Sequence, residues 1–343
     1  MSRWPRASSR GPSPGSSTGP WMRSPAMSGP APRGLDEFGE IARLFRPLAR
    51  GAPGAFELMD DAAVIPSRPG FDLVITKDAI IEGVHFLAGE RAELVGRRLA
   101  RVNLSDLAAK GAEPQAAFLA VAWPPVWTEA DRASFAAGLG ADLKDAGVSL
   151  LGGDTVATPG PFTASLTLMG WVPGGRMVRR ASARAGDRLM VSGHIGDAWL
   201  GLAAARGQVA DPDGYLEGRY RLPTPRLDLA RAVLDHASSA ADVSDGLIAD
   251  AGHIAEASGV ELVLDLERVP LSAAARAWLA LQPDATAARL ALASGGDDYE
   301  IVATAAVALP GFTVIGEVVE GHGVTVRDNG QPVEPGAGGW RHG

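Results

Sequence analysis

The sequence predicts a mixed α/β (α+β) protein of two domains. Segments with strand-like alternation and segments with helical spacing follow one another along both halves of the chain. The chain has 343 residues, 46% of them hydrophobic, which is enough for a sizeable core and suggests two domains by length. Pro173-Gly174-Gly175 separates the two series of elements. The domains are therefore expected at residues 35–172 and 173–343.

Residues 1–34 differ in composition from the rest of the chain. They are rich in Arg, Ser, Gly and Pro, and no acidic residue precedes Asp36. Such a segment buries too little apolar surface to offset the entropy lost on ordering. Its prolines and glycines also forbid the amphipathic helix of a transit peptide. We expect a disordered tail, or a start set upstream of a true initiator at Met22 or Met27.

The first half is expected to hold five strands and three helices. Apolar residues from Phe38 to Leu48 recur at helical spacing after Asp36, a favourable N-cap. Residues 71–76 alternate as a strand, residues 77–92 read as a loop, and a long helix from Glu93 to Lys110 ends at Gly111. The remaining elements are a loop and strand at 55–66, strands at 116–122, 148–151 and 162–172, and a helix at 128–146.

The second half repeats the alternation. A strand at 187–192 leads through a Gly-rich turn into a helix that ends near Arg206, and a polar connection follows at 207–222. Helices are expected at 225–236, 247–257, 272–281 and 286–292, and strands at 260–264, 301–304, 312–318 and 324–327.

Charge and residue usage exclude several classes of function. Lys+Arg 32 against Asp+Glu 40 gives a net charge of −8, which argues against general nucleic-acid or anionic-membrane binding. Cysteine is absent, which excludes disulfides and thiolate chemistry and fits a cytoplasmic location. No apolar run approaches the ~20 residues of a membrane helix. No phosphate-binding P-loop, protein-kinase loop set or dinucleotide fingerprint occurs, so a nucleotide would bind through metals and scattered loops.

Acidic residues stand in short loops of small residues instead of in runs. Asp60-Asp61 and Asp78 lie at either end of a short apolar strand, with Thr76 two residues before Asp78 and His85 after it. Further acids follow at Asp106, Asp154, Asp242, Asp245, Asp297 and Asp298. Clustered oxygen ligands without cysteine suit Mg²⁺. We expect these loops to converge on a metal-bound polyphosphate.

Each loop taken alone also has an ordinary structural explanation. Asp106 shares a helical face with Asn103, and the helix by itself slightly favours a solvent-exposed Asp106. Gly-Gly-Asp at 152–154 is common in plain turns, and the acids at 242–245 could cap a helix as readily as bind metal. A lone His85 beside apolar residues is more often structural, and most surface arginines such as Arg180 bind no phosphate.

Taken together and in this order, the segments resemble the thiamine-monophosphate kinase family, within the aminoimidazole-ribotide-synthetase-like ATP-binding superfamily. The resemblance covers about residue 35 to the end of the chain. It is carried by six segments at 59–63, 76–86, 102–112, 151–155, 242–247 and 294–300.

This resemblance implies a fold and an activity. The N-terminal sheets of two subunits would pair into a barrel-like homodimer, with ATP in the cleft between domains. The reaction would be Mg²⁺-assisted phosphorylation of thiamine monophosphate to thiamine diphosphate. The implied Mg²⁺ ligands are Asp61, Thr76, Asp78, Asp106, Asp154, Asp242 and Asp245. The implied ATP contacts are Gly153, Asp154, Arg180 and Ser244, and the implied substrate contacts are His85, Asp297 and Trp340, whose ring would stack on thiamine.

The chain departs from the family pattern at three places. Met59 replaces a common Gly, Lys77 replaces a common Thr, and the chain ends short of the usual aromatic finish. Lys77 could place its charge directly on a phosphate, which leaves the number of metal ions open. Two other functions stay possible: aminoimidazole-ribotide synthase, and a non-catalytic nucleotide-binding module that binds ATP without forming ADP.

Overall fold

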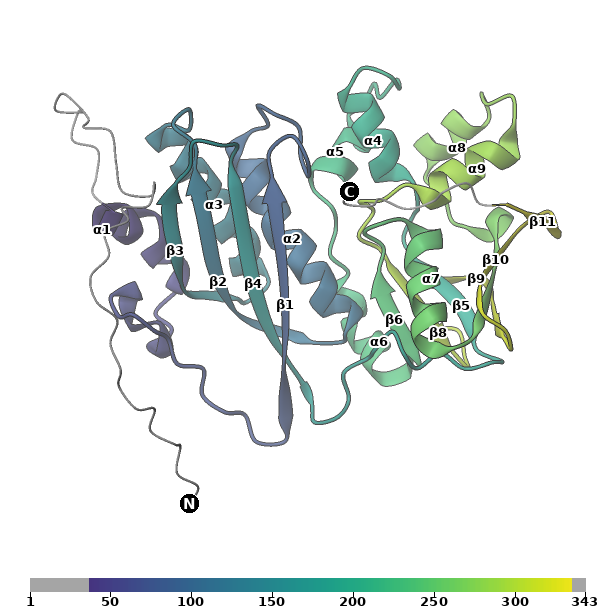
Figure 1. Ribbon diagram of the computed structural model, residues 1–343, viewed down its shortest axis with the longest axis horizontal. Coiled ribbons are helices and arrows are strands. Elements are labelled where there is room, and N and C mark those ends of the chain that lie inside the picture. Colours follow the sequence, from purple (N-terminus) through teal and green to yellow (C-terminus); the bar gives the residue numbers. More distant parts are fainter. Residues whose placement is uncertain (1–36, 335–343) are drawn as a thin grey trace, which may run out of the picture. The chain divides into compact units, whose positions relative to one another are not determined.

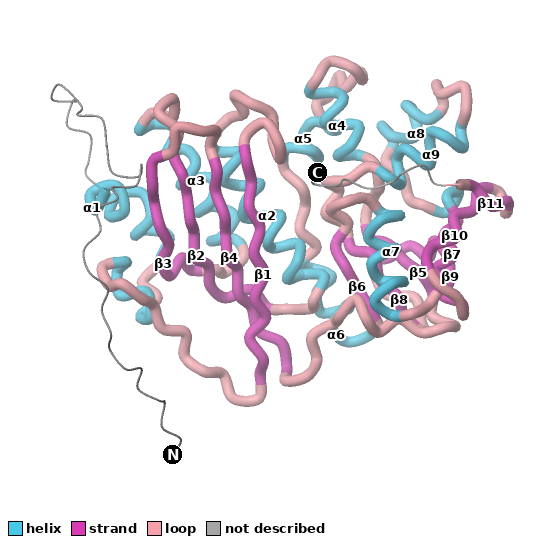
Figure 2. The backbone as a smooth tube through the Cα atoms, viewed as in Figure 1, coloured by secondary structure: helices cyan, strands magenta, loops and turns pink. Residues whose placement is uncertain are grey.

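The computed structural model describes residues 37–334, which form two β-sheets and the helices packed on them (Figure 1). Strands and helices alternate in both halves, so the mixed α/β class is confirmed (Figure 2). The predicted N-terminal tail and Trp340 lie outside the described residues.

The first sheet has four strands in the order β1-β4-β2-β3, with β2 and β3 parallel and the other pairs antiparallel. The strands are β1 (Phe71–Ile81), β2 (Glu113–Trp123), β3 (Ser149–Ala157) and β4 (Thr163–Pro173). Helices α2 (Ala92–Ala109) and α3 (Glu129–Asp145) lie on the same side of this sheet (Figure 1). Leu99, Phe135 and Leu139 from the helices share one apolar core with Leu166 and Leu168 of β4.

Two glycines let α2 and α3 cross closely. A Cβ on Gly96 would lie 2.2 Å from the carbonyl oxygen of Phe135, and one on Gly138 would lie 2.1 Å from that of Glu93. Thr128 and Asp131 close the N-terminus of α3 as a capping box. The helix pair is thereby fixed against the sheet.

The opposite face of the first sheet is covered at one end, where residues 49–65 pack on Ala116 and Met169, and is exposed over the rest. Along β1 the side chains alternate, so that Val74, Thr76 and Asp78 face the helices while Ile75 and Lys77 face away. Ile75 is 60% exposed, and Val156 of β3 is 50% exposed. Large apolar side chains on an open sheet face indicate a surface that a partner can cover.

The second sheet has seven strands in the order β11-β10-β7-β9-β5-β8-β6. Its strands are β5 (Arg188–Ser192), β6 (Ser239–Asp242), β7 (Glu261–Asp265), β8 (Ile301–Ala305), β9 (Phe312–Val319), β10 (Gly323–Asp328) and β11 (Gln331–Val333). The helices of this half are α4 (Asp197–Ala205), α5 (Tyr215–Arg221), α6 (Ala230–His236), α7 (Leu247–Ser258), α8 (Ala273–Leu279) and α9 (Ala285–Ser294). The core lies between the sheet and α7, where Ala251 and Ile254 pack with Leu262 and Leu264.

Helix α2 contacts both sheets. Its N-terminal two-thirds belongs to the first core, while Ala108 and Ala109 pack against Ala240, Ile301 and Ala303 of β6 and β8. Residues 37–334 accordingly fall within one compact unit. A division into domains at residues 172 and 173 stays a prediction.

Three expectations for the first half were wrong in part. Strand β1 continues to Ile81, so Asp78 lies on a strand and not in a loop, because β4 supplies hydrogen-bond partners along the whole length. Residues 55–66 form a 3₁₀ turn at Pro53–Leu58 and no strand. The helix expected to Leu48 ends at Glu40 (α1, Glu37–Glu40) and continues as a π turn and a 3₁₀ turn, the latter beginning with Arg46-Pro47.

The second half holds three elements that the pattern did not indicate. Helix α5 lies in the predicted polar connection, β6 is built from small residues with little strand signal, and β11 is a three-residue edge strand. In the first half, β3 also runs on through Gly152-Gly153-Asp154 to Ala157, whereas the strand is expected from the sequence to end at Leu151.

Candidate active site

An acidic cluster forms where β1 faces α2. The Thr76 hydroxyl donates a hydrogen bond to Asp106 Oδ2, and Asp78 lies two residues further along the same face. Asn103, fully buried on α2, accepts a bond from the Asp78 backbone N–H at 3.1 Å and donates to the Leu99 carbonyl at 2.9 Å. Asn103 therefore fixes the strand to the helix at the level of the acids.

These acids are held together without enough opposing charge. The pKa of Asp78 is raised to about 7. Burial is the largest cause, and repulsion by the Asp106 carboxylate and a hydrogen bond with it add to the rise. Burial and the charges of Asp106, Asp250 and Asp78 raise the pKa of Asp242, at the end of β6, well above its usual range. Carboxylates crowded in this way bind protons or cations. An oxygen-only donor set of this kind fits Mg²⁺.

Lys110, near the C-terminal end of α2, is a cation next to these acids. Its ammonium group donates to the Ala240 carbonyl at 2.7 Å. Burial and the charge of Arg180 lower its pKa to about 8, against the opposing effect of Asp242 and Asp106. One lysine does not neutralise three carboxylates.

The loop after β6 is shaped by Asp250, another residue that the motif analysis missed. One oxygen of its buried carboxylate accepts the backbone N–H groups of Ser244 and Asp245, both at 3.0 Å. Burial raises the pKa of Asp250 to about 7. Within residues 37–334, the one group of three ligand atoms all within 4.8 Å of one another is Asp245, Asp250 and His253. The wider spacing at Asp78, Asp106 and Asp242 suits ions that also take phosphate oxygens as ligands.

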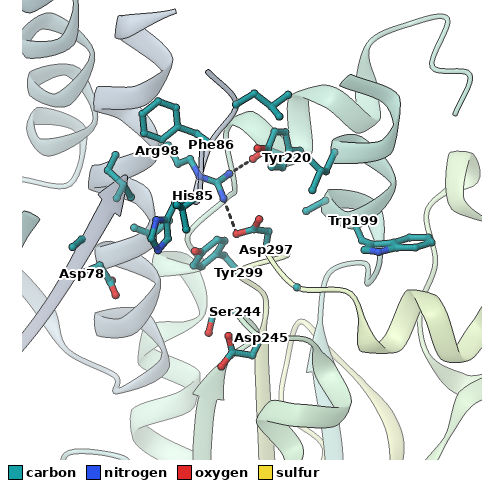
Figure 3. A pocket seen from close by; sticks show the side chains of 18 of the residues that line it. Asp78, His85, Phe86, Arg98, Trp199, Tyr220, Ser244, Asp245, Asp297 and Tyr299 are labelled. Carbon is teal, nitrogen blue, oxygen red and sulfur yellow. Dashed lines mark hydrogen bonds and ion pairs between the residues drawn. The ribbon is translucent and has the colours of Figure 1, made fainter. Parts of the chain in front are cut away.

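A pocket of about 530 Å³ adjoins the acidic cluster (Figure 3). It is lined by residues of both halves, including Asp78, His85, Ser244, Asp245 and Asp297. His85 Nδ1 accepts the Ile81 backbone N–H at 3.1 Å, so the proton of the neutral ring lies on Nε2. Five predicted site residues from three separate motifs thus meet at one cavity.

A second acidic group surrounds another pocket, of about 470 Å³. Asp60, Asp61 and Asp154 share this cavity with apolar side chains, among them Phe38, Ile41 and Phe118. Gly153 has φ +156°, and a Cβ there would lie 1.8 Å from the Leu119 carbonyl oxygen. Only glycine fits at this position.

The two acidic groups do not meet within one chain. Across the sheet, Asp154 of β3 lies level with Ala120 of β2, Ser165 of β4 and Ala79 of β1. Residues at the same level share a face, and Ala79 lies on the exposed face with Ile75 and Lys77. Asp154 therefore also points to the exposed face of the sheet. Asp78 points to the helix-covered face. Strands β1 and β3 are three strand spacings apart, which separates the backbones of Asp78 and Asp154 by about 14 Å. Their side chains are further apart because they lie on opposite faces of the sheet.

Two more predicted residues can be placed. The Lys77 ammonium lies on the exposed face, 3.4 Å from the Thr167 hydroxyl, and not with Asp78. Arg180 is exposed, and its charge acts on Lys110 and Asp250 at the edge of the acidic cluster.

The fold and the paired acidic sites define a class of protein. Family models for the N-terminal and C-terminal domains of AIR synthase related proteins match residues 59–172 and 184–329. The chain therefore has the two-part architecture of that class.

Similar proteins narrow the class. A thiamine-monophosphate kinase of Caulobacter vibrioides is 54% identical over 335 residues, covering 94% of this chain and 95% of that protein. A thiamine-monophosphate kinase of Salmonella typhimurium is 40% identical over 78% of this chain and 82% of its own length. The chain belongs to the thiamine-monophosphate kinase family.

Solved structures agree with this placement. The crystal structure of thiamine-monophosphate kinase from Stenotrophomonas maltophilia superposes with a TM-score of 0.71 at 38% identity, covering 80% of this chain and 90% of that one. AaThiL complexed with AMPPCP and TMP gives a TM-score of 0.71 at 32% identity, covering 81% and 89%.

Proposed function

We propose that this chain transfers the terminal phosphoryl group of ATP to thiamine monophosphate, forming thiamine diphosphate and ADP. The observation that carries the proposal is the 530 Å³ pocket, in which Asp78, His85, Ser244, Asp245 and Asp297 converge beside the buried acids. Membership of the thiamine-monophosphate kinase family supports it, as does the related structure that holds AMPPCP and TMP together.

The chemical difficulty of this reaction is the meeting of two polyanions. Two unit charges at ~4 Å repel by about 4 kcal/mol at the effective dielectric of a protein surface. Mg²⁺, when bound by the acidic cluster, would offset this repulsion and stabilise the charge of an in-line transfer. A phosphate monoester loses its second proton near pH ~6, so the acceptor oxygen needs no strong general base.

The residues divide into three roles. Thr76, Asp78, Asp106 and Asp242 hold metal on the helix-covered face of the first sheet, with Asp245 at the neighbouring loop. Ser244 and Arg180 contact the nucleotide phosphates. His85 donates from Nε2 to the substrate phosphate, and Asp297 accepts a hydrogen bond from the thiamine moiety. Trp340 remains a predicted stacking partner.

The second pocket serves the nucleotide in this proposal. Its apolar side chains offer a surface for a base, and the close backbone approach at Gly153 suits a phosphate. Asp61 and Asp154 then supply metal ligands on the same side. Such a nucleotide must reach both acidic groups, which one chain keeps apart.

A homodimer resolves this separation. The exposed face of the first sheet carries Ile75 and Val156 as well as Asp154, and a second copy of this sheet packed on it would bury the apolar residues. Asp61 and Asp154 of one subunit would then join the acidic cluster of the other. The barrel-like pairing implied by the family resemblance is of this kind.

Product analysis tests the proposed reaction. Purified protein is mixed with Mg-ATP and thiamine monophosphate, and thiamine diphosphate and ADP are measured in a 1:1 ratio. A second mixture contains formylglycinamidine ribotide in place of thiamine monophosphate. Release of ADP in that mixture alone would indicate aminoimidazole-ribotide synthase activity. ATP binding without any ADP would point to a nucleotide-binding module and contradict the proposal.

The cellular location follows less directly from the structure. Within residues 37–334 no helix is long and apolar enough to cross a membrane. A cytoplasmic location and the lack of nucleic-acid partners stay predictions from composition.

A further inference from the structure

Arg98 is a buried arginine in the wall of the 530 Å³ pocket that no motif singled out. It lies on α2, and its side chain is only 4% exposed. One guanidinium nitrogen, Nη2, is 2.6 Å from Asp297 Oδ1, and the other, Nη1, donates to the Tyr220 carbonyl (Figure 3). The guanidinium carbon also lies 5.0 Å from the centre of the Tyr220 ring. Three contacts therefore fix the orientation of this side chain.

The partner of Arg98 lies in a strained stretch of backbone. Asp297 has φ +71° and Tyr299 has φ +51°, which are left-handed conformations that cost side-chain-bearing residues energy. Backbone bonds from Asp297 to the Ser244 carbonyl, at 2.9 Å, and from Tyr299 to the Val243 carbonyl, at 2.8 Å, hold the stretch from one side. Arg98 holds the same stretch through its contact with the Asp297 carboxylate. The backbone and the carboxylate of Asp297 are thus fixed by different contacts.

The two oxygens of the Asp297 carboxylate have different surroundings. Arg98 contacts Oδ1, and none of the described residues forms a hydrogen bond or ion pair with Oδ2. Asp297 is 33% exposed and lines the pocket, whereas Arg98 is almost fully covered. A ligand can therefore reach the carboxylate but not the guanidinium.

We propose that Arg98 is the positioning residue for substrate recognition: it orients Asp297 so that Oδ2 accepts an N–H donor of the thiamine moiety. This inference rests on the proposed substrate contact of Asp297. It also links two parts of the site, because Arg98 and Asp106 stand eight residues apart on α2, about 12 Å along the helix axis. The helix then sets the distance between the group that recognises thiamine and the group that holds metal.

Two substitutions separate positioning from simple structural support. Arg98→Lys keeps the charge but loses the planar fork that holds a carboxylate and a carbonyl together. Arg98→Met removes the charge at similar length, and Asp297 stays solvated because it is one-third exposed. Arg97→Lys is the matched control, since Arg97 is the adjacent arginine of α2 and pairs with Asp142, 2.9 Å away on α3, outside the pocket.

The experiment measures KM for thiamine monophosphate, KM for Mg-ATP and kcat in each variant, alone and combined with Asp297→Asn. Both Arg98 variants should raise the KM for thiamine monophosphate at least tenfold and change the KM for Mg-ATP less than twofold. Arg97→Lys should change neither. In the Asp297→Asn background, the Arg98 substitutions should raise the KM for thiamine monophosphate less than threefold, because the group they position is already lost.

The possible failures are distinguishable. The role of Arg98 would be overturned if its substitution raised the KM for thiamine monophosphate and the KM for Mg-ATP equally. It would also be overturned if the tenfold rise in the KM for thiamine monophosphate were the same with and without Asp297→Asn. Either result would leave the substrate contact of Asp297 intact. A wild-type KM in Asp297→Asn itself would overturn that contact and this inference together, while thiamine diphosphate formation by the unmodified protein would still stand.

Discussion

At the scale of single residues, the site consists of polar groups placed where folding alone disfavours them. Asp242 and Asp250 are buried and Asp78 is half-buried, and burial is the largest cause of the raised pKa of each. A protein that only needed stability would place apolar residues there. Perturbed carboxylates beside a pocket are typical of a functional site.

Stability should therefore depend on pH and metal together. The pKa of Asp78 is raised from 3.8 to about 7, so the folded protein binds more protons than the unfolded chain between these values. The metal-free protein should lose stability as pH rises through that window, and Asp250 adds to the loss in the same direction. Mg²⁺ needs ionised carboxylates, so its stabilising effect should grow with pH.

Thermal unfolding at pH 5.5 and pH 8, with and without Mg²⁺, checks this expectation. The rise in Tm caused by Mg²⁺ should be larger at pH 8, and Asp78→Asn should reduce that difference. Asp145→Asn, on the exposed end of α3, is the control and should leave it unchanged. An equal Mg²⁺ effect at both pH values would contradict the assignment of metal to these acids.

Part of the residue-scale description was open to prediction from sequence. The order of six short motifs indicated Asp78, Asp106 and Asp242 as a group, and the structure brings them together. Arg98 and Asp250 were missed because each lies within a helix and outside the motif residues that carry the resemblance. Their signal was a charge at a position that the helical spacing assigns to the buried face.

At the scale of elements, α2 organises the site. It carries Arg98, Asn103 and Asp106 on one helix and packs on both sheets. Its own position depends on the close crossing with α3. The helix was predictable because its pattern is long and regular, whereas the full length of β1 depends on pairing with β4, which is distant in sequence.

The close crossing of α2 and α3 can be tested by a Gly→Ala substitution. Helix propensity alone predicts that such a substitution stabilises the protein, whereas the close packing predicts that it destabilises it. Alanine is favoured over glycine inside a helix by about 1 kcal/mol. At Gly138 the added Cβ would lie 2.1 Å from the Glu93 carbonyl oxygen, so Gly138→Ala should lower the free energy of unfolding. Gly218 in α5 has no atom within 4 Å of such a Cβ, so Gly218→Ala should be neutral or stabilising.

Urea denaturation of the two variants measures both effects. We expect Gly138→Ala to lose roughly 1–3 kcal/mol. If Gly138→Ala were as stable as Gly218→Ala, the close packing of α2 on α3 would be wrong.

At the scale of the whole molecule, the sheet topology decides which acids can meet. The order β1-β4-β2-β3 puts β3 at the far edge from β1, and the register turns Asp154 to the exposed face. Sequence motifs cannot reveal this, because strand order and facing depend on contacts between segments far apart along the chain. The expectation that all seven metal ligands converge therefore requires two subunits.

Subunit complementation tests this central claim most directly. Asp106→Asn and Asp154→Asn chains, each inactive alone, are refolded together and assayed for thiamine diphosphate. If each site uses Asp106 of one subunit and Asp154 of the other, every mixed dimer has one intact site, and random pairing restores about a quarter of wild-type activity. A mixture of Asp106→Asn with Asp78→Asn, whose lesions lie in the same acidic cluster, should stay inactive. Equal inactivity of both mixtures would contradict a site shared between subunits.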